Sequence, residues 1–352
     1  MPGTVLLFGH ADSADTVNQF LRDLAQGFRD LEQPCLLTML DGRTPLALDP
    51  AVIRQSGSFA VDINAKIDTG DFPKLSLIVD HPVSHPRLLA PGARTVLGLI
   101  DREHCRIGDY LRAPAVFIPH GGPPPDVIAA SPRDIDVLFV GNLLGEAIPR
   151  TPMEARAVEI GRGIALSCTD PFSAVLAEFG RLDPLEIKPL LDLATNESQR
   201  LARLAALRSI RAARIHVVGY VPDDLVEQMP DGAILHGFDR SFFQGRDLMH
   251  RAKVVINVTQ KFPAGSHERI WYGMAAGCAV VTNRSSFLAE DFVHGESILF
   301  YDDPRQVGDL VEIALGGDQA RAMAAAALPA YEAGHTWTER AERIMVAMIG
   351  RT

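Results

Sequence analysis

Short, unbroken apolar runs recur along the whole chain and limit its fold more than any other feature. Residues 4–8, 35–40, 75–79 and 95–100 are examples from the first half. Strands that are buried on both faces have this composition, whereas strands with one face in water alternate apolar and polar residues. Patterns with helical spacing separate the runs, as in 17–28. The sequence therefore predicts an α/β fold of parallel sheets covered by helices.

Two series of these runs are present, and a stretch rich in proline and glycine, 121–133, lies between them. The first series predicts strands at 4–8, 35–40, 59–63, 75–79, 95–100 and 115–118. The second predicts strands at 135–140, 214–219, 233–237, 253–258, 279–282 and 297–301. The stretch between them is typical of a linker. We therefore expect two doubly wound, Rossmann-like domains, 1–130 and 131–334, that face each other across a cleft.

Helices are expected mainly in the second half. Residues 151–212 have a helical pattern, and we expect breaks in it at Pro171, Pro184 and Pro189. Further helices are predicted at 245–251, 266–276, from 302 onward, at 319–331 and at 336–349. The last of these lies in a C-terminal segment, 335–352, that could cross back to the first domain.

Length and charge bound the class of protein. A chain of 352 residues is too long for one ordinary core and suits two. The formal charge of −10 disfavours a nucleic-acid partner, which needs basic patches, but it does not exclude a small anionic ligand. No apolar run approaches the roughly 20 residues that span a bilayer. Residues 1–9 lack the basic start of a signal peptide and are interpreted as the first buried strand.

Cysteine usage indicates a reducing compartment. The four cysteines are widely scattered and form no Cys-x-x-Cys motif of the kind that binds zinc: Cys35, Cys105, Cys168 and Cys278. Small core thiols are the favoured interpretation, and a cytoplasmic location follows. The sequence leaves open a peripheral association with membranes and a homo-oligomer.

Residues 257–283 suggest an anion site. They comprise an apolar strand, a loop with glycine and proline, a short helix, a glycine stop and a second apolar strand. The amides at a helix start, with the positive end of the helix dipole, hold phosphate. Ser266 is predicted to cap this helix. A positive side chain such as Arg269 is unfavourable in the first turn of a helix unless an anion binds there, and the guanidinium suits phosphate. His267 lies at the same helix start and is expected to be exposed in the same way. The alternative is that Glu268 and Arg269 pair on a solvated surface.

Polar residues also follow the strand ends of the first half. They are His10, Asp12, Asp80, His81, Asp101, His104 and His120. In open parallel sheets the ligand crevice lies beyond the carboxyl ends of the strands, so we expect these side chains to line one edge. The alternative is that several of them cap helices or close turns.

The second half resembles a known family. The run that carries the likeness is His267-Glu268-Arg269-Ile270-Trp271-Tyr272-Gly273-Met274-Ala275-Ala276-Gly277-Cys278-Ala279-Val280-Val281-Thr282. It resembles the donor-site segment of GT-B fold glycosyltransferases (glycosyl transferases group 1). It is more similar still to the CgeB-like group, named after spore-maturation proteins, whose members read approximately His-x-Arg-x-Phe-Glu-x-x-Ala-x-Gly-x-x-x-x-Thr. Segments 136–142, 247–258, 288–296 and 335–340 extend the likeness over roughly 136–350.

The resemblance implies a glycosyltransferase of the hexosyltransferase type. Its second domain would bind a nucleotide-diphosphate sugar, a UDP-sugar most of all. Its first domain would present a glycan, lipid-linked or protein acceptor. No cofactor and no metal are implied, because the helix dipole and basic side chains would stabilise the departing diphosphate. The implied donor-binding residues are Gly141, Asn142, Gly219, Tyr220, Phe238, Asn257, Thr259, Ser266, His267, Arg269 and Tyr272.

Two positions depart from the family pattern. Many relatives have a ribose-binding glutamate where this chain has Tyr272, and retaining relatives often have another where it has Ala264. The missing glutamates favour an inverting enzyme, which needs a general base from the first domain. The candidates are His10 with Asp12 as its partner, His81 with Asp80, and His120. Two alternatives stay open: a sugar-nucleotide 2-epimerase-like enzyme, and a degenerate GT-B protein that binds without catalysis.

Overall fold

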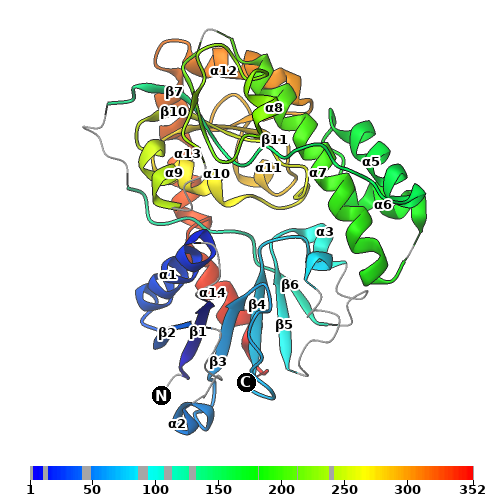
Figure 1. The fold of residues 1–352 in the computed structure, drawn as a ribbon. Helices are drawn as coiled ribbons and strands as arrows, with labels where there is room; N and C mark the ends of the chain where they lie inside the picture. Colours follow the sequence, from blue (N-terminus) through cyan, green and yellow to red (C-terminus); the bar gives the residue numbers. More distant parts are fainter. Residues whose placement is uncertain are drawn as a thin grey trace. The chain divides into compact units, whose positions relative to one another are not determined.

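The computed structural model describes residues 3–10, 15–41, 49–85, 94–106, 113–126, 132–180, 182–211, 213–237 and 242–351. The chain divides into two compact units (Figure 1). Unit 1 comprises Met1–Pro123 and Gly334–Thr352, and unit 2 comprises Pro124–Ala333. The domain boundary expected near residue 130 falls within 127–131, outside the described residues.

Unit 1 is built on six parallel strands in the order β2-β1-β3-β4-β5-β6. They are β1 Val5–His10, β2 Cys35–Leu40, β3 Phe59–Ile63, β4 Lys74–Ile78, β5 Thr95–Leu99 and β6 Ala115–Phe117. Every residue of β3, β4 and β5 is buried, which explains why these runs are almost wholly apolar. All six predicted strands of the first half are therefore confirmed. The helices among them are α1 Asp15–Asp30, α2 Pro50–Ile53, η1 Pro82–Ser84 and α3 Arg102–Cys105.

The C-terminal helix, α14 Trp337–Met348, also belongs to unit 1, where it packs against α1. Two backbone hydrogen bonds tie it down: Gly122 N–H donates to the carbonyl of His335 at 3.0 Å, and Trp337 N–H donates to the carbonyl of Gly122 at 2.9 Å. Arg340 is fully buried and donates from Nε to the carbonyl of His120 at 3.0 Å. The expected return of the last helix to the first domain is thus confirmed.

Unit 2 is built on a second parallel sheet, in the order β12-β11-β10-β7-β8-β9. Its strands are β7 Ile135–Val140, β8 Ile215–Val218, β9 Ile234–Leu235, β10 Ala252–Asn257, β11 Ala279–Asn283 and β12 Leu299–Tyr301. Its helical segments are α5 Pro152–Ile164, α6 Pro171–Phe179, α7 Pro184–Ser209, α8 Asp223–Val226, α9 Phe242–Met249, α10 Glu268–Ala275, α11 Leu288–Asp291, η3 Pro304–Gln306, α12 Val307–Leu315 and α13 Gln319–Gly334. Among the described residues, no helix is both long enough and apolar enough to cross a bilayer.

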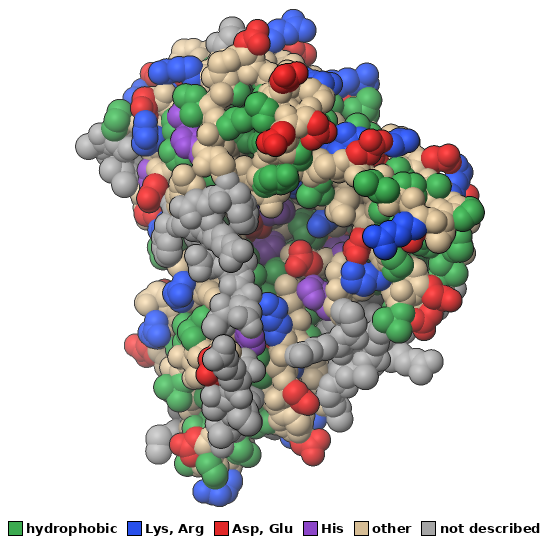
Figure 2. Space-filling view, viewed as in Figure 1, with side chains coloured by type: hydrophobic (Ala, Val, Ile, Leu, Met, Phe, Trp, Pro, Cys, Tyr) green, Lys and Arg blue, Asp and Glu red, His purple; other side chains and the backbone are tan. Residues whose placement is uncertain are grey.

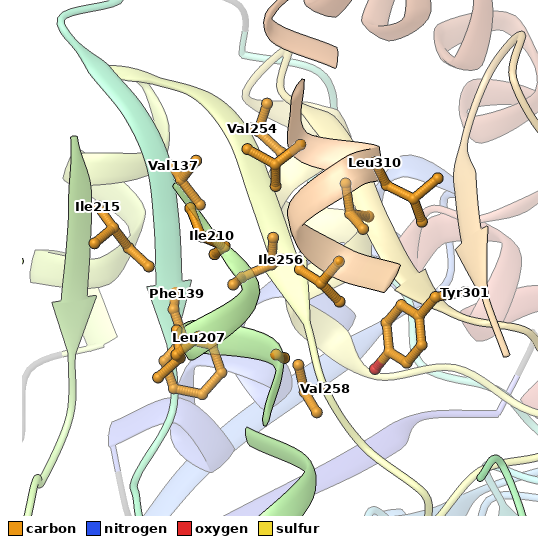
Figure 3. Close-up of a cluster of buried hydrophobic side chains, with 14 of the residues drawn as sticks. Val137, Phe139, Leu207, Ile210, Ile215, Val254, Ile256, Val258, Tyr301 and Leu310 are labelled. Atoms are coloured by element: carbon orange, nitrogen blue, oxygen red, sulfur yellow. The ribbon is translucent and has the colours of Figure 1, made fainter. Parts of the chain in front are cut away.

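Helices cover both faces of this sheet. Val254 and Ile256 of β10 point into a buried cluster with Leu207 of α7 and Leu310 of α12 (Figure 3). Side chains alternate along a strand, so Val255 points to the opposite face. There it meets α10, whose Gly273 lies close enough that an added Cβ would be 3.4 Å from the Val255 Cβ. The alternation explains why β10 must be apolar at every core position.

The three prolines of the helical region do not all act as breaks. Pro171 and Pro184 are the first residues of α6 and α7, a position that proline favours. Pro189 lies inside α7, which continues to Ser209, so the predicted break there is wrong. The carbonyl that loses its donor belongs to Leu185, which is 61% exposed, and water can replace the missing N–H. A capping box at Asp183 further stabilises this end of the helix.

Figure 2 shows one face of the helical part of unit 2, on which Lys and Arg side chains are interspersed with Asp and Glu. Arg156 of α5, for example, pairs with Glu159 at 2.9 Å and with Glu178 at 2.8 Å. Exposed pairs of this kind contribute little to stability individually.

The burial of His335 makes the stability of unit 1 depend on pH. Burial, together with the charges of Arg340 and Arg343, lowers the pKa of His335 to about 3 from an ordinary 6.5. A depressed histidine pKa stabilises the fold at neutral pH, and this contribution is lost as the pH falls from 6.5 towards 3. Over this pH range the free energy of unfolding should fall less steeply for His335→Gln than for the parent. We expect the two slopes to differ by roughly 1 kcal/mol per pH unit.

The measurement is urea unfolding followed by the fluorescence of Trp337. Both proteins carry Trp271→Phe, so that only the tryptophan of unit 1 remains. His250→Gln, a change in unit 2, serves as the control and should keep the parent's pH slope for unit 1. Equal slopes for His335→Gln and its parent would contradict the prediction.

Candidate functional site

Three loops meet at the carboxyl edge of the unit 2 sheet. Gly141 and Asn142 follow β7, and Gly219 and Tyr220 follow β8. Tyr220 N–H donates to Asn142 Oδ1 at 2.8 Å, and the Tyr220 carbonyl accepts from Leu143 N–H at 2.7 Å. The third loop begins at the end of β10. The structure thus joins Gly141, Asn142, Gly219 and Tyr220, four of the residues that the family resemblance implies for donor binding.

Gly219 allows the first two loops to approach each other. Its φ of +141° is a conformation that residues with a Cβ rarely adopt. A Cβ at this position would lie 2.4 Å from the carbonyl oxygen of Gly141. At Gly141 itself, a Cβ would lie 3.4 Å from Nη1 of Arg269. The two glycines therefore bring backbone close to a guanidinium.

The loop between β10 and α10 is held from several sides. Gln260 donates from Nε2 to the carbonyls of Ile164 at 2.9 Å and Ser167 at 2.6 Å, at the end of α5. Ser285 Oγ donates to the carbonyl of Gly265 at 2.6 Å. Asn257, at the end of β10, donates to Thr282 Oγ1 at 2.9 Å. These bonds hold the loop in one arrangement, and buried Thr259 lies within it.

The start of α10 differs from the prediction in one respect. His267 is the N-cap residue, and no side chain among the described residues caps the helix there. The predicted cap, Ser266, instead accepts a hydrogen bond from Trp271 Nε1 at 2.9 Å. The reason is that Trp271 is fully buried, so its indole N–H requires an acceptor. Gly277, with φ of +77°, follows the last residues of the helix, as predicted.

Arg269 is buried at this helix start. Only 8% of its surface is exposed, which rules out a solvated pair with Glu268. Its Nη2 lies 3.2 Å from Nε2 of His267, whereas its Nε and Nη1 have no hydrogen-bond partner among the described residues. Burial lowers the pKa of Arg269, and Glu268 partly offsets this. Two buried donors without an acceptor make this guanidinium a candidate for binding an anion.

A second buried arginine, Arg203 of α7, lies beside the first. It is 7% exposed, and its Nε donates to the carbonyl of Val258 at 3.3 Å. Its Nη1 donates to the carbonyl of Asn142 at 2.5 Å. Burial and the charge of Arg269 lower its pKa to about 9, so it remains cationic at neutral pH. Among the described residues, no carboxylate is bonded to either arginine.

Arg203 was not among the predicted site residues. One signal was present, because position 203 lies between Ala202 and Leu204, on the side of α7 that helical periodicity predicts to be buried. A basic residue on such a face calls for an explanation, but the sequence does not show which loop it meets.

The other predicted donor residues have different surroundings. The carbonyl of Asn257 accepts a hydrogen bond at 3.1 Å from the hydroxyl of Tyr301, which lies at the end of β12 and was not predicted as a site residue. Figure 3 shows the Tyr301 ring in the same cluster as Val258. Asn257 is buried, and its Oδ1 has no partner among the described residues. Tyr272 is 2% exposed within α10. Phe238 and Asp12 lie outside the described residues.

Several polar residues of unit 1 act as helix caps. Asp101 accepts from Glu103 N–H at 2.7 Å, and His81 Nδ1 accepts from Val83 N–H at 3.3 Å. His81 also packs against His104, with ring centroids 4.5 Å apart. The alternative noted for these positions, that they cap helices, therefore holds for Asp101 and His81.

The remaining base candidates differ in exposure. His10 is partly exposed at the end of β1, where its carbonyl accepts from Asn18 Nδ2 at 3.1 Å. His120 is 1% exposed, with its ring 5.4 Å from that of Phe20. Asp80 accepts from Asn64 Nδ2 at 3.2 Å and lies 3.8 Å from His85 Nε2. Within the described part of the chain, no group of three His, Cys, Asp or Glu side chains is placed to hold a metal ion.

Comparison with known proteins gives the fold a name. Residues 200–346 match a family model described as Glycosyl transferase-like. Sucrose-phosphate synthase from Thermosynechococcus elongatus is similar in structure, with a TM-score of 0.55 and 11% identity over 99% of this chain and 98% of that one. The fold is GT-B. No curated protein matches the sequence.

Two further structures share this fold. HepE from Anabaena, solved in complex with UDP-glucose, has a TM-score of 0.52 and 11% identity over 98% of this chain and 99% of that one. The DNA-modifying enzyme β-glucosyltransferase, studied with uridine diphosphoglucose, has a TM-score of 0.54 and 9% identity over 100% and 99%. Both cover the two units, so the GT-B fold predicted from the second half extends to the first.

A methyl group at Gly219 tests the geometry of these loops. We expect Gly219→Ala to destabilise unit 2 by about 2 kcal/mol or more, because its Cβ would meet the Gly141 carbonyl and its φ is unfavourable. Gly163→Ala, at an uncrowded helical position, should be neutral or slightly stabilising. Urea unfolding followed by Trp271 fluorescence, in Trp337→Phe proteins, measures both. Two variants of equal stability would show that the close approach of the loops is wrong.

Proposed function

We propose that this protein is a glycosyltransferase whose unit 2 binds a nucleotide-diphosphate sugar. The observation that carries the proposal is the buried guanidinium of Arg269, which offers Nε and Nη1 without an acceptor at the start of α10. The segment that matches the Glycosyl transferase-like family model contains this arginine and Arg203. A diphosphate is the anion that best fits two adjacent guanidinium groups and a helix start.

The charges at the site explain how such a reaction is assisted. Burial of two cations without a bonded carboxylate is costly, and an incoming diphosphate offsets that cost. When the bond from the sugar to the diphosphate breaks, negative charge grows on the departing oxygen. Arg269, Arg203 and the first amides of α10 would already be in position to stabilise that charge. The residues of unit 2 could thus assist departure by charge alone.

A UDP-sugar is the favoured donor. HepE and β-glucosyltransferase are two neighbours that were studied with UDP-glucose. In this chain, Tyr220 is 54% exposed, and the bonds to Asn142 and Leu143 hold its backbone in place. An exposed aromatic side chain on a fixed loop suits stacking against a base. The transfer of a hexose, membership of the CgeB-like group and a cytoplasmic location belong to the same proposal.

For the acceptor side we propose an inverting transfer with His10 as the general base. The acceptor is a glycan, a lipid-linked group or a protein. His81 is less suited, because its Nδ1 already accepts from Val83, and the neutral ring then carries its proton on Nε2. His120 is almost completely buried. His10 is the partly exposed candidate at a strand end, which supports its role.

Nucleotide binding tests the donor site. Thermal shift against UDP, GDP, CMP and dTDP should identify a stabilising nucleotide, and isothermal titration should give its affinity. Arg269→Met and Arg203→Met should each weaken binding by about 10- to 100-fold, because each removes a charged donor from the phosphates. Arg321→Met, at an exposed position, should bind as the wild type does. If no nucleotide binds at millimolar concentration, the proposed function is wrong.

Product analysis tests the reaction. The matching sugar nucleotide should be hydrolysed slowly by the wild type, as transferases do without an acceptor. His10→Ala should retain nucleotide affinity while transfer falls by at least 100-fold. Wild-type turnover in His10→Ala would discard this base, and a new sugar-nucleotide isomer would indicate an epimerase instead.

A further inference from the structure

A histidine and a glutamate form a pair at the start of α10, beside the buried arginines. His267 Nδ1 contacts the carboxylate of Glu268, and Arg269 Nη2 lies 3.2 Å from His267 Nε2. A guanidinium only donates hydrogen bonds, so Nε2 accepts here and the ring proton is on Nδ1. The imidazole is therefore neutral in this arrangement. Its Nε2 faces the guanidinium to which a diphosphate would bind.

Glu268 would weaken an anion site unless its negative charge is balanced. A carboxylate near a diphosphate repels it. Glu268 is directed to His267, and its side chain is only 16% exposed. When a diphosphate takes over the donors of Arg269, His267 Nε2 faces an anionic oxygen while Nδ1 still faces Glu268. Negative groups on both ring nitrogens favour the imidazolium, which donates from both.

We propose that binding of the sugar nucleotide protonates His267, and that His267 then donates this proton to the departing diphosphate. The inference rests on the proposed function and adds a chemical step to it. Glu268 is a positioning residue, because its carboxylate contacts Nδ1 and balances the charge of the ring.

The transfer step balances as follows. The bond between the sugar C1 and the diphosphate oxygen breaks, and its electron pair stays on that oxygen. The proton on Nε2 of His267 moves to the same oxygen. The acceptor oxygen forms the new bond to C1 and gives its proton to the base of unit 1. His267 is left neutral and takes a proton from solvent before the next cycle.

The surrounding charges make protonation conditional on the ligand. Arg269 follows His267 at the start of α10. Arg203 of α7 and Tyr301 of β12 lie within electrostatic range of Arg269. The ring of Phe262 is 5.9 Å from that of His267. Before the ligand binds, the two arginines oppose a third positive charge, whereas Glu268 favours it. The diphosphate neutralises the arginines and reverses this balance.

Isothermal titration of the full chain with UDP-glucose, in buffers of different ionisation enthalpy, measures the proton exchanged. The diphosphate of a sugar nucleotide carries no group that titrates near neutral pH, so a proton taken up binds to the protein. We expect uptake of roughly one proton on the alkaline side of neutrality and an affinity that falls about tenfold per pH unit there. If another sugar nucleotide gives the larger thermal shift, it replaces UDP-glucose.

Three variants locate the proton. His267→Gln should abolish the uptake and the pH dependence of affinity, and transfer should fall by about 100-fold or more. Glu268→Gln should reduce the uptake. His250→Gln should keep the wild-type uptake. His250 is a matched control because its Nε2 lies 3.3 Å from the carboxylate of Asp126, in the same unit.

The outcomes separate the two proposals. Wild-type binding without proton uptake, or uptake that persists in His267→Gln, overturns the role of His267 and leaves the proposed function standing. Failure of the wild type to bind any sugar nucleotide overturns both. If His267→Gln does not fold, the isosteric Glu268→Gln decides, and unchanged uptake in that variant counts against the proposal.

Discussion

The buried charge of Arg269 is the constraint around which unit 2 is arranged. Its guanidinium is almost fully removed from water, yet Nε and Nη1 have no acceptor among the described residues. Arg203 adds a second cation whose bonds go to backbone carbonyls and not to a carboxylate. Such a pair is stable only because a well-packed sheet and a long helix hold it. The stability of the unit therefore offsets the cost of keeping two cations buried.

The parallel sheet explains how these residues meet. The carboxyl ends of parallel strands lie at one edge, so residues far apart in the sequence, such as Gly141, Gly219 and Asn257, become neighbours. The approach is closer than most residues permit. A Cβ at Gly219 would meet the Gly141 carbonyl, and a Cβ at Gly141 would approach Arg269. The parallel sheet places these loops at one edge, and the two glycines allow the backbone to lie close to the guanidinium.

Much of this arrangement could be predicted from the sequence, and the failures have physical reasons. The twelve described strands were found because each is a short apolar run, as strands buried on both faces must be, although the edge strands β2, β6 and β9 are only partly buried. The break at Pro189 was wrong because its cost depends on whether water reaches the carbonyl of Leu185. The cap at Ser266 was wrong because the indole of Trp271 competes for its hydroxyl. Arg203 was missed because its partners are backbone carbonyls of distant loops, which leave no local pattern.

The two units differ in what their residues reveal about chemistry. In unit 2, charge, burial and hydrogen bonding all converge on the start of α10, where Glu268, His267 and Arg269 form a chain of contacts. That chain needs three consecutive residues, so sequence alone could place them together. In unit 1 the candidate histidines stand on separate strands, and at least one of them, His81, is engaged in capping. A base in unit 1 must therefore be chosen by its exposure and its available nitrogen, and not by a motif. The proposed donor site is therefore defined by contacts between neighbouring residues, whereas the proposed acceptor site depends on which histidine the acceptor meets.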